Sequence, residues 1–307
     1  MTSAAVIATY NGEKYIIELL QSILNQSIKI DEVVICDDLS TDNTRELVNE
    51  FINKNGLESS WRLLVNEKNL GYAENYRKGI KSVNGDIIFT ADQDDIWEKT
   101  RLENMLAVME SSDEIGVLNT DYFEFSDNLE EAIQIVNELS LDNFINLGKV
   151  KLNAKNRFLK FPGCVMCFRK DYFESIEKHW FNGWAHDEFL WCVSVLDERC
   201  FYANVITLLR RVHEGQTSGK IGRDRFKRIK YLEGELKCVN KLIEIAKEKG
   251  VDKKTLKIYQ KNEKATALRL ELVKERKIFN LFKLLFLLKY YNSKKSYLVE
   301  GLMAIKG

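Results

Sequence analysis

The chain has 307 residues, of which 45% are hydrophobic and 30% charged, a composition typical of a soluble globular protein. No apolar run approaches the roughly 20 residues of a membrane-spanning helix, and Met1–Ala5 lack the basic start of a signal peptide. We therefore expect a cytoplasmic protein. Its six cysteines are too few for a secreted disulfide scaffold, so free thiols are expected, and the single Cys164–Cys167 pair lacks the partners of a zinc site.

The net charge of zero conceals a division of the chain into two parts. Residues 223–307 carry 23 Lys and Arg against 10 Asp and Glu, a net charge of +13. Residues 1–222 carry 23 basic and 36 acidic side chains, a net charge of −13. A sign asymmetry of this size predicts two functional regions, residues 1–222 and residues 223–307.

Short apolar runs alternate with helical patterns in the first hundred residues. The runs Ala4–Thr9, Val33–Cys36, Trp61–Val65 and Ile87–Thr90 predict buried strands. Apolar residues at helical spacing follow each of the first three runs, and Asn11 is a plausible N-cap for the first helix. The alternation predicts an α/β fold with a mostly parallel central sheet flanked by helices.

Three of the predicted strands end in polar residues, at 9–11, 37–38 and 92–95. Ligands of open α/β sheets bind at the carboxyl ends of the strands, so these clusters should meet at one site. The chain has neither the G-x-G-x-x-G pattern nor a P-loop, which excludes the common glycine-rich phosphate cradles.

The last cluster contains three carboxylates, Asp92, Asp94 and Asp95, within four residues. Their mutual repulsion costs free energy, and a hard divalent cation held by oxygen ligands would offset that cost. The alternative is an acidic turn that caps the helix expected to begin near Lys99.

Four motifs occur in order along the chain: A-T-Y-N-G-E-K-Y-I at 8–16, D-E-V-V-I-C-D-D-L-S-T-D-N-T at 31–44, N-L-G-Y-A-E-N-Y at 69–76 and A-D-Q-D-D-I-W at 91–97. As a set they resemble the family 2 glycosyltransferases, which have the Rossmann-like GT-A fold. The D-Q-D-D-I-W form is similar to that of the rhamnosyltransferase-type members that build bacterial surface polysaccharides. The resemblance implies a GT-A catalytic domain at 1–222 and leaves 223–307 as a helical C-terminal extension.

The resemblance also implies roles for residues at the strand ends. The implied substrate contacts there are Thr9, Tyr10, Asn11, Glu13, Asp38, Asn75 and Asp92. Of these, Thr9 and Asn11 would line the nucleotide pocket, and Asp38 would contact the base of the donor. Asp92 and Asp94 would form the Asp-x-Asp pair that holds Mn²⁺ or Mg²⁺. Asp92 would also face the ribose of the donor. Whether Asp95 shares the metal stays open.

A second acidic segment, W-A-H-D-E at 184–188, matches the position of the family's catalytic base. The resemblance assigns the base to Asp187, with Glu188 as the alternative. His186 stands where the family has Glu and is expected to orient or contact the acceptor. Taken alone, an acidic residue at a helix start is ordinarily an N-cap or a partner of the helix dipole. An inverting transfer needs one carboxylate near the acceptor hydroxyl to take its proton.

The segment at 209–219 resembles the family's R-x-H-x-x-N-x-S-G loop, with Gln216 in place of Asn. The resemblance implies that Arg211 binds the diphosphate and that His213 contacts the diphosphate or the metal. Such groups would stabilise the charge of a departing nucleoside diphosphate. The alternative for His213 is an ordinary histidine of a surface loop.

The middle of the chain is less informative. Apolar residues at helical spacing within 102–109 predict a helix packed on the core. Glu124–Lys160 shows no clear period and is expected to be an insertion or an acceptor-facing loop. Phe161–Arg169 matches a family segment that lies near the donor sugar and the acceptor.

The basic tail predicts helices at Tyr231–Lys249 and Lys254–Lys277, separated at Gly250. The apolar run Ile278–Leu288, flanked by lysines and tyrosines, is too short to span a bilayer. It suits either an interfacial helix on anionic lipid or a helix–helix or dimer interface, and both alternatives stay open. No nucleic-acid-binding module is recognisable, so nucleic acid is not an expected partner.

Together these features predict a metal-dependent, inverting glycosyltransferase of cell-surface polysaccharide biosynthesis. The donor would be dTDP-rhamnose or a UDP-sugar, and the acceptor a saccharide or lipid-linked saccharide, at the inner face of the cell membrane. One alternative is a sugar-nucleotidyltransferase, which usually carries a basic, Gly-rich loop where this chain has Thr9–Glu13. The other is a non-catalytic binding or assembly protein with the same fold.

Overall fold

The computed structural model describes residues 1–126, 128–140, 146–213 and 224–306. The chain forms two compact units, one made of residues 1–150 and 159–215 and the other of residues 151–158 and 216–307. The boundary predicted between 222 and 223 lies outside the described residues. None of the described helices is both long and apolar enough to cross a membrane.

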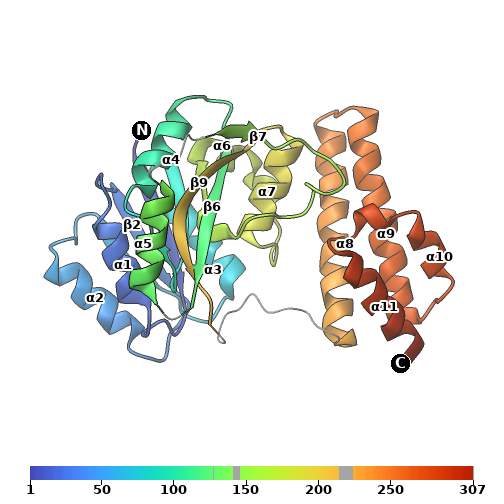
Figure 1. Cartoon of the computed structure of the whole chain (residues 1–307), viewed down its shortest axis with the longest axis horizontal. Coiled ribbons are helices and arrows are strands. Elements are labelled where there is room, and N and C mark those ends of the chain that lie inside the picture. Colours follow the sequence, from blue (N-terminus) through green and yellow to red (C-terminus); the bar gives the residue numbers. More distant parts are fainter. Residues whose placement is uncertain (127, 141–145, 214–223, 307) are drawn as a thin grey trace. The chain divides into compact units, whose positions relative to one another are not determined.

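A mixed sheet forms the centre of the first unit (Figure 1). Its strands are β1 (Ser3–Thr9), β2 (Glu32–Asp37), β3 (Trp61–Val65), β4 (Ile87–Asp92), β5 (Ile96–Trp97), β6 (Val117–Phe125), β7 (Leu147–Lys149), β8 (Met166–Arg169) and β9 (Cys200–Arg211). They follow the order β3-β2-β1-β4-β8-β6-β9-β5, with β7 paired to β9. The first four in this order are parallel, as the alternating pattern predicted, and β8 is antiparallel to both of its neighbours.

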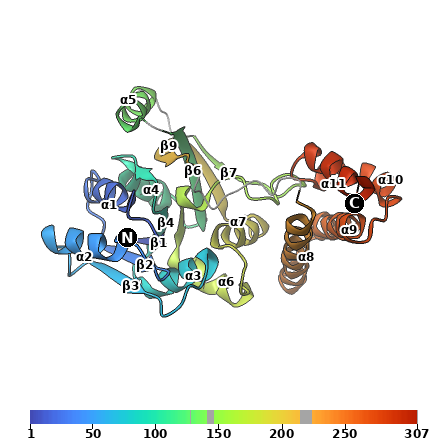
Figure 2. The ribbon, with the colours of Figure 1, turned by 90° about the horizontal axis from the view of Figure 1, so that it is seen from below.

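Helices cover both faces of this sheet (Figure 2). They are α1 (Ile16–Leu24), α2 (Thr44–Lys54), α3 (Tyr72–Ser82), α4 (Arg101–Glu110), α5 (Leu129–Ser140), α6 (Lys170–Ile176) and α7 (His186–Leu196). Apolar residues of α1, α2 and α4 pack with alternate residues of β1, β2 and β4 in one buried cluster. On the opposite face, a Cβ at Gly79 of α3 would meet Val6 at 2.4 Å, so α3 packs very close to β1.

Glu124–Lys160, expected to be an insertion or an acceptor-facing loop, contains regular secondary structure. The segment contains α5 and β7, and Ala132 and Val136 of α5 are buried against Phe125 and Leu209. Leu129, Ala132, Ile133 and Val136 of α5 do recur at helical spacing, which the sequence analysis did not use.

The second unit is helical. Its elements are α8 (Arg225–Glu248), α9 (Lys253–Glu275), α10 (Asn280–Leu285), the 3-10 turn η3 (Leu288–Tyr290) and α11 (Lys294–Lys306). Gly250 has a φ of +63° in the turn between α8 and α9, a conformation that glycine adopts without strain. Asp252 caps α9 by accepting the backbone N–H groups of Lys254 and Thr255.

Ile278–Leu288 does not form the continuous helix that its apolar run suggested. Only Asn280–Leu285 is α-helical. Asn280 donates its side-chain amide to Glu271 at 3.0 Å, which ties the start of this helix to α9. Leu284 is buried beside Leu272 and Tyr291.

A buried ionic network joins the helices of this unit. Arg269 of α9 donates two hydrogen bonds to Glu300 of α11, at 3.0 and 2.8 Å, and a third to Glu235 of α8 at 3.2 Å. Arg157 of the 151–158 segment lies 3.5 Å from Glu235, and Arg228 lies 3.6 Å from Glu300. Burial opposes the charge on Arg269, but the two carboxylates raise its pKa, so the guanidinium stays ionised.

Removing one partner of a buried ion pair leaves an uncompensated charge, which is strongly destabilising. We predict that Glu300→Gln lowers the free energy of unfolding of this unit by about 3–5 kcal/mol. Glu275→Gln removes an exposed carboxylate of the same region, paired with Lys277 at 2.7 Å, and should change it by less than about 0.5 kcal/mol. Urea unfolding followed by circular dichroism measures both values, and equal effects of the two changes would contradict the account.

Candidate active site

The carboxyl ends of β1, β2 and β4 lie side by side. Thr9 is level with Asp37, and Ala8 with Asp92, in the parallel register. The polar clusters predicted to converge therefore do so, and Gln93 joins them.

Gln93, which the sequence did not single out, bridges the ends of β1 and β4. Its side-chain oxygen accepts the hydroxyl of Thr9 at 2.6 Å and the N–H of Tyr10 at 2.9 Å. Its amide nitrogen donates to the Tyr10 carbonyl at 3.2 Å. A Cβ at Gly12 would lie 2.4 Å from the same oxygen, so the turn after β1 needs glycine to admit Gln93.

Asn11 and Glu13 fasten the loop that follows β2. Asn11 does not cap α1, whose N-cap residue is Tyr15. It lies in the left-handed region, with φ +50°, and its side-chain oxygen accepts the N–H of Thr41 at 2.8 Å. The Glu13 carboxylate accepts the backbone and side-chain N–H groups of Asn43 at 3.0 and 2.9 Å.

Asp38 and Asn75 organise the loop that precedes α3. The buried Asp38 carboxylate accepts the N–H groups of Leu70 at 2.7 Å and Gly71 at 2.8 Å. The side-chain amide of Asn66 donates to both Asp38 and Asn75, at 2.8 and 2.9 Å. These two predicted substrate contacts thus hold the loop in place, and a contact of Asp38 with a base stays a prediction.

Each carboxylate of the turn after β4 has a hydrogen-bond partner from another element. Asp92 Oδ1 lies 2.6 Å from the hydroxyl of Tyr76, and Asp94 Oδ2 lies 2.8 Å from His213 Nε2. Asp95 accepts the backbone N–H of Arg211 at 3.1 Å. The three aspartates do not cap α4, whose N-cap residue is Thr100.

The electrostatics of this turn favour a positive ligand. Burial raises the pKa of Asp95 well above its ordinary value, and the neighbouring charges of Asp92 and Asp94 raise it further. Burial likewise raises the pKa of Asp92. A cation would relieve both effects, because it replaces lost hydration and offsets the repulsion.

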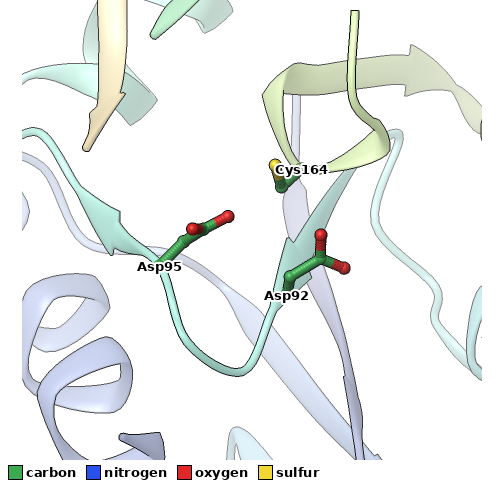
Figure 3. A group of neighbouring side chains, drawn as sticks. All are labelled: Asp92, Asp95 and Cys164. Carbon is green, nitrogen blue, oxygen red and sulfur yellow. The ribbon is translucent and has the colours of Figure 1, made fainter. Parts of the chain in front are cut away.

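Among the described residues, one group of three potential ligands has donor atoms all within 4.8 Å of one another: Asp92, Asp95 and Cys164 (Figure 3). Burial raises the pKa of the Cys164 thiol well above its ordinary value, and sulfur is a soft ligand that suits Mg²⁺ and Mn²⁺ poorly. The predicted ligands Asp92, Asp94 and His213 instead offer oxygen and nitrogen atoms, and their donor chemistry fits Mg²⁺ or Mn²⁺.

Arg211, at the end of β9, supports the acidic turn. Its guanidinium pairs with Glu18 of α1 and donates to the Asp94 carbonyl oxygen at 3.1 Å. The rings of Tyr15 and Phe125 each lie 4.7 Å from it. Its predicted contact with a diphosphate stays a prediction, and residues 214–219 of that predicted loop lie outside the described residues.

The start of α7 presents His186, Asp187 and Glu188. Burial raises the pKa of Asp187, although the N–H groups of Glu188, at 2.8 Å, and of Gly163 hydrogen-bond its carboxylate and oppose the shift. The His186 ring is 4% exposed and neutral, because burial lowers its pKa to about 4. Within the described residues, neither of its ring nitrogens has a hydrogen-bond partner.

Tyr76 of α3 connects this helix start to the acidic turn. Its ring centroid lies 3.8 Å from that of His186, while its hydroxyl reaches Asp92. Burial raises the Tyr76 pKa far above its ordinary value, so the phenol stays protonated and can donate. A Cβ at Gly163 would lie 2.5 Å from His186 Nε2, so glycine there permits the close packing. Tyr76 is part of the motif at 69–76, but the sequence did not indicate its contacts with His186 and Asp92.

Removing the Tyr76 hydroxyl leaves the partly buried Asp92 carboxylate short of a donor. We predict that Tyr76→Phe lowers the free energy of unfolding by about 1–3 kcal/mol, although the ring remains. Tyr10→Phe removes the hydroxyl of a tyrosine that is 48% exposed and should have almost no effect. Equal stability of Tyr76→Phe and the parent protein in urea unfolding would show that the hydrogen bond does not support the site.

Comparison with known proteins places these residues in a wider context. The model of the family described as "Glycosyl transferase family 2" matches residues 4–179. The dTDP-rhamnosyl transferase RfbG of Shigella flexneri is 39% identical over 108 residues, which are 33% of this chain and 35% of that protein. Glycosyltransferase GlyG of Streptococcus pneumoniae is 26% identical over 193 residues, which are 60% of this chain and 62% of that protein. The chain thus spans less than two thirds of the length of these relatives.

Solved structures with the same fold include residues 1–349 of S. aureus TarS in complex with UDP-GlcNAc. That structure has a TM-score of 0.63 and 20% sequence identity, and the match covers 98% of this chain and 81% of that chain. At this identity the likeness establishes the GT-A-like fold.

Proposed function

The chain belongs to glycosyl transferase family 2, and we propose that it transfers a sugar from a nucleoside-diphosphate donor to a hydroxyl group of a saccharide, with inversion at the anomeric carbon. The acceptor would be a saccharide or lipid-linked saccharide of a cell-surface polysaccharide, and the reaction would take place on the cytoplasmic side of the membrane. The names of the relatives favour dTDP-rhamnose or a UDP-sugar as the donor.

One observation carries this proposal. Tyr76 contacts both the acidic turn, through Asp92, and the start of α7, through the ring of His186. The carboxylate proposed to act as the base therefore lies on the helix start packed against the proposed diphosphate site. An inverting transfer requires these two groups to face one reaction centre.

The proposed reaction is a single displacement. The acceptor hydroxyl passes its proton to Asp187, its oxygen forms a bond to the anomeric carbon, and the bond from that carbon to the diphosphate breaks. Burial raises the pKa of Asp187 and so makes its carboxylate a better proton acceptor, provided that it is ionised before the reaction. The neutral His186 ring beside it adds no competing charge.

Asp94, Asp92 and His213 would hold the divalent cation, with Asp95 adjacent. When bound, such a cation would neutralise negative charge on the departing diphosphate. The raised pKa values of Asp92 and Asp95 support this role, because carboxylates whose charge is disfavoured gain most from a cation. The family match supports a glycosyltransferase over a nucleotidyltransferase.

We predict that Asp187→Asn lowers turnover by about 10²–10⁴-fold, since the amide cannot accept the proton. Release of nucleoside diphosphate from a panel of UDP- and dTDP-sugars, with saccharide acceptors, provides the assay. In the parent protein, activity should fall as the pH drops through a pKa above the ordinary aspartate value of 3.8, because the base must be ionised. This acidic limb should be missing from the residual activity of the variant.

Glu188→Gln is the matched control, because it changes the neighbouring carboxylate on the same helix turn. It should retain activity within about tenfold of the parent. A larger loss in Glu188→Gln than in Asp187→Asn would move the base to Glu188.

A further inference from the structure

An exposed apolar face lies on α10 of the helical unit. Phe279, Phe282 and Phe286 are 70%, 64% and 87% exposed, and Ile278 and Leu285 are also exposed. Their spacing places all five on one side of the helix that they form and flank. The rings of Phe279 and Phe282 are 5.9 Å apart, so they form a continuous apolar surface. We call these five residues the α10 face.

The opposite side of α10 packs against the rest of the helical unit. Leu284 is buried, and Leu281 and Leu288 pack against the same cluster. A Cβ at Gly301 of α11 would lie 3.3 Å from Leu281, so α11 also packs closely against α10. The α10 face therefore cannot turn inward without giving up the core contacts of the unit. An exposed apolar face on a helix whose other side is already buried is typical of an interaction site, which implies that something else covers this face.

The charges around the α10 face indicate what covers it. From residue 276 to residue 299 the chain has six Lys and Arg and no Asp or Glu. Lys277 pairs with Glu271 and Glu275 at 3.4 and 2.7 Å. The other five basic residues, Arg276, Lys283, Lys289, Lys294 and Lys295, are exposed. In the described part of the chain, no carboxylate lies within 4.0 Å of their charged nitrogens. Two of these lysines lie over aromatic rings, Lys283 over Phe279 and Lys289 over Tyr290.

Exposed aromatics with these unpaired basic residues close to them in the chain match the interface of an anionic bilayer. The rings enter the boundary between headgroups and acyl chains, while lysine side chains extend to the phosphates. A second copy of this chain is a poorer partner, because a two-fold contact would bring the same cations together. We propose that the α10 face docks this protein on an anionic lipid surface.

This inference goes beyond sugar transfer and is tested without donor or acceptor. The full-length protein is mixed with vesicles of phosphatidylcholine alone, or of phosphatidylcholine with phosphatidylglycerol, and sedimented. We expect binding to the anionic vesicles that is at least about tenfold tighter than to the neutral ones and that weakens as salt is raised.

Two sets of substitutions separate the apolar and ionic contributions. The first set combines Phe279→Ser, Phe282→Ser and Phe286→Ser. Its control is Phe226→Ser, which replaces a ring of α8 that is 80% exposed. The second set replaces four lysines by Gln, at Lys283, Lys289, Lys294 and Lys295. Its control replaces four exposed lysines of α9 by Gln, at Lys253, Lys257, Lys261 and Lys264. Each test set should weaken binding to anionic vesicles by at least about tenfold, and each control should not.

Because every replaced side chain is exposed, thermal unfolding should be the same for all variants. No sedimentation of the parent protein, equal binding to both kinds of vesicle, or equal losses in tests and controls would overturn the proposal. So would a dimer of the parent protein in light scattering that the phenylalanine changes dissociate, because the α10 face would then bind a second copy. Sugar transfer to a water-soluble acceptor is assayed separately, so a failure of lipid binding and a failure of catalysis are distinct results.

Discussion

Three carboxylates in one four-residue turn repel one another, and the neighbouring elements of the first unit are arranged around that repulsion. Helix α3 supplies the Tyr76 hydroxyl to Asp92, the end of β9 supplies the Arg211 N–H to Asp95, and His213 contacts Asp94. These donors stabilise the turn only in part, because burial and repulsion still raise the pKa of Asp95. Incomplete compensation of this kind is what a site for a cation and a charged substrate requires.

The sequence predicted the parallel half of the sheet well. Strands buried on both faces appear as unbroken apolar runs, and the turn residues between them are distinctive. Since carboxyl ends of parallel strands share an edge, the meeting of Thr9, Asp38 and Asp92 followed directly. The motifs identified the family, which the family match confirms.

Contacts between distant segments were not predictable in the same way. Gln93 and Tyr76 hold the site together through hydrogen bonds that appear only when β1, α3 and β4 are packed. In the basic tail, Glu300 and Arg269 resemble any other charges of a Lys-rich helix, yet they form a buried pair. Helix α5 is a different case, because Leu129, Ala132 and Val136 recur at helical spacing and a local pattern was present. The contacts of Gln93, Tyr76, Arg269 and Glu300 depend on the distant residue that each one meets, and no local sequence pattern indicates that residue.

The most direct test of this account is calorimetric titration of the protein with UDP, dTDP and GDP, each with and without Mn²⁺. The account predicts that one of these diphosphates binds only in the presence of Mn²⁺, and that Asp94→Ala abolishes this binding. Asp113→Ala, which removes a fully exposed aspartate, should leave it unchanged. Absence of binding by all three diphosphates, or binding that needs neither Mn²⁺ nor Asp94, would contradict the assignment of the acidic turn as the metal and diphosphate site.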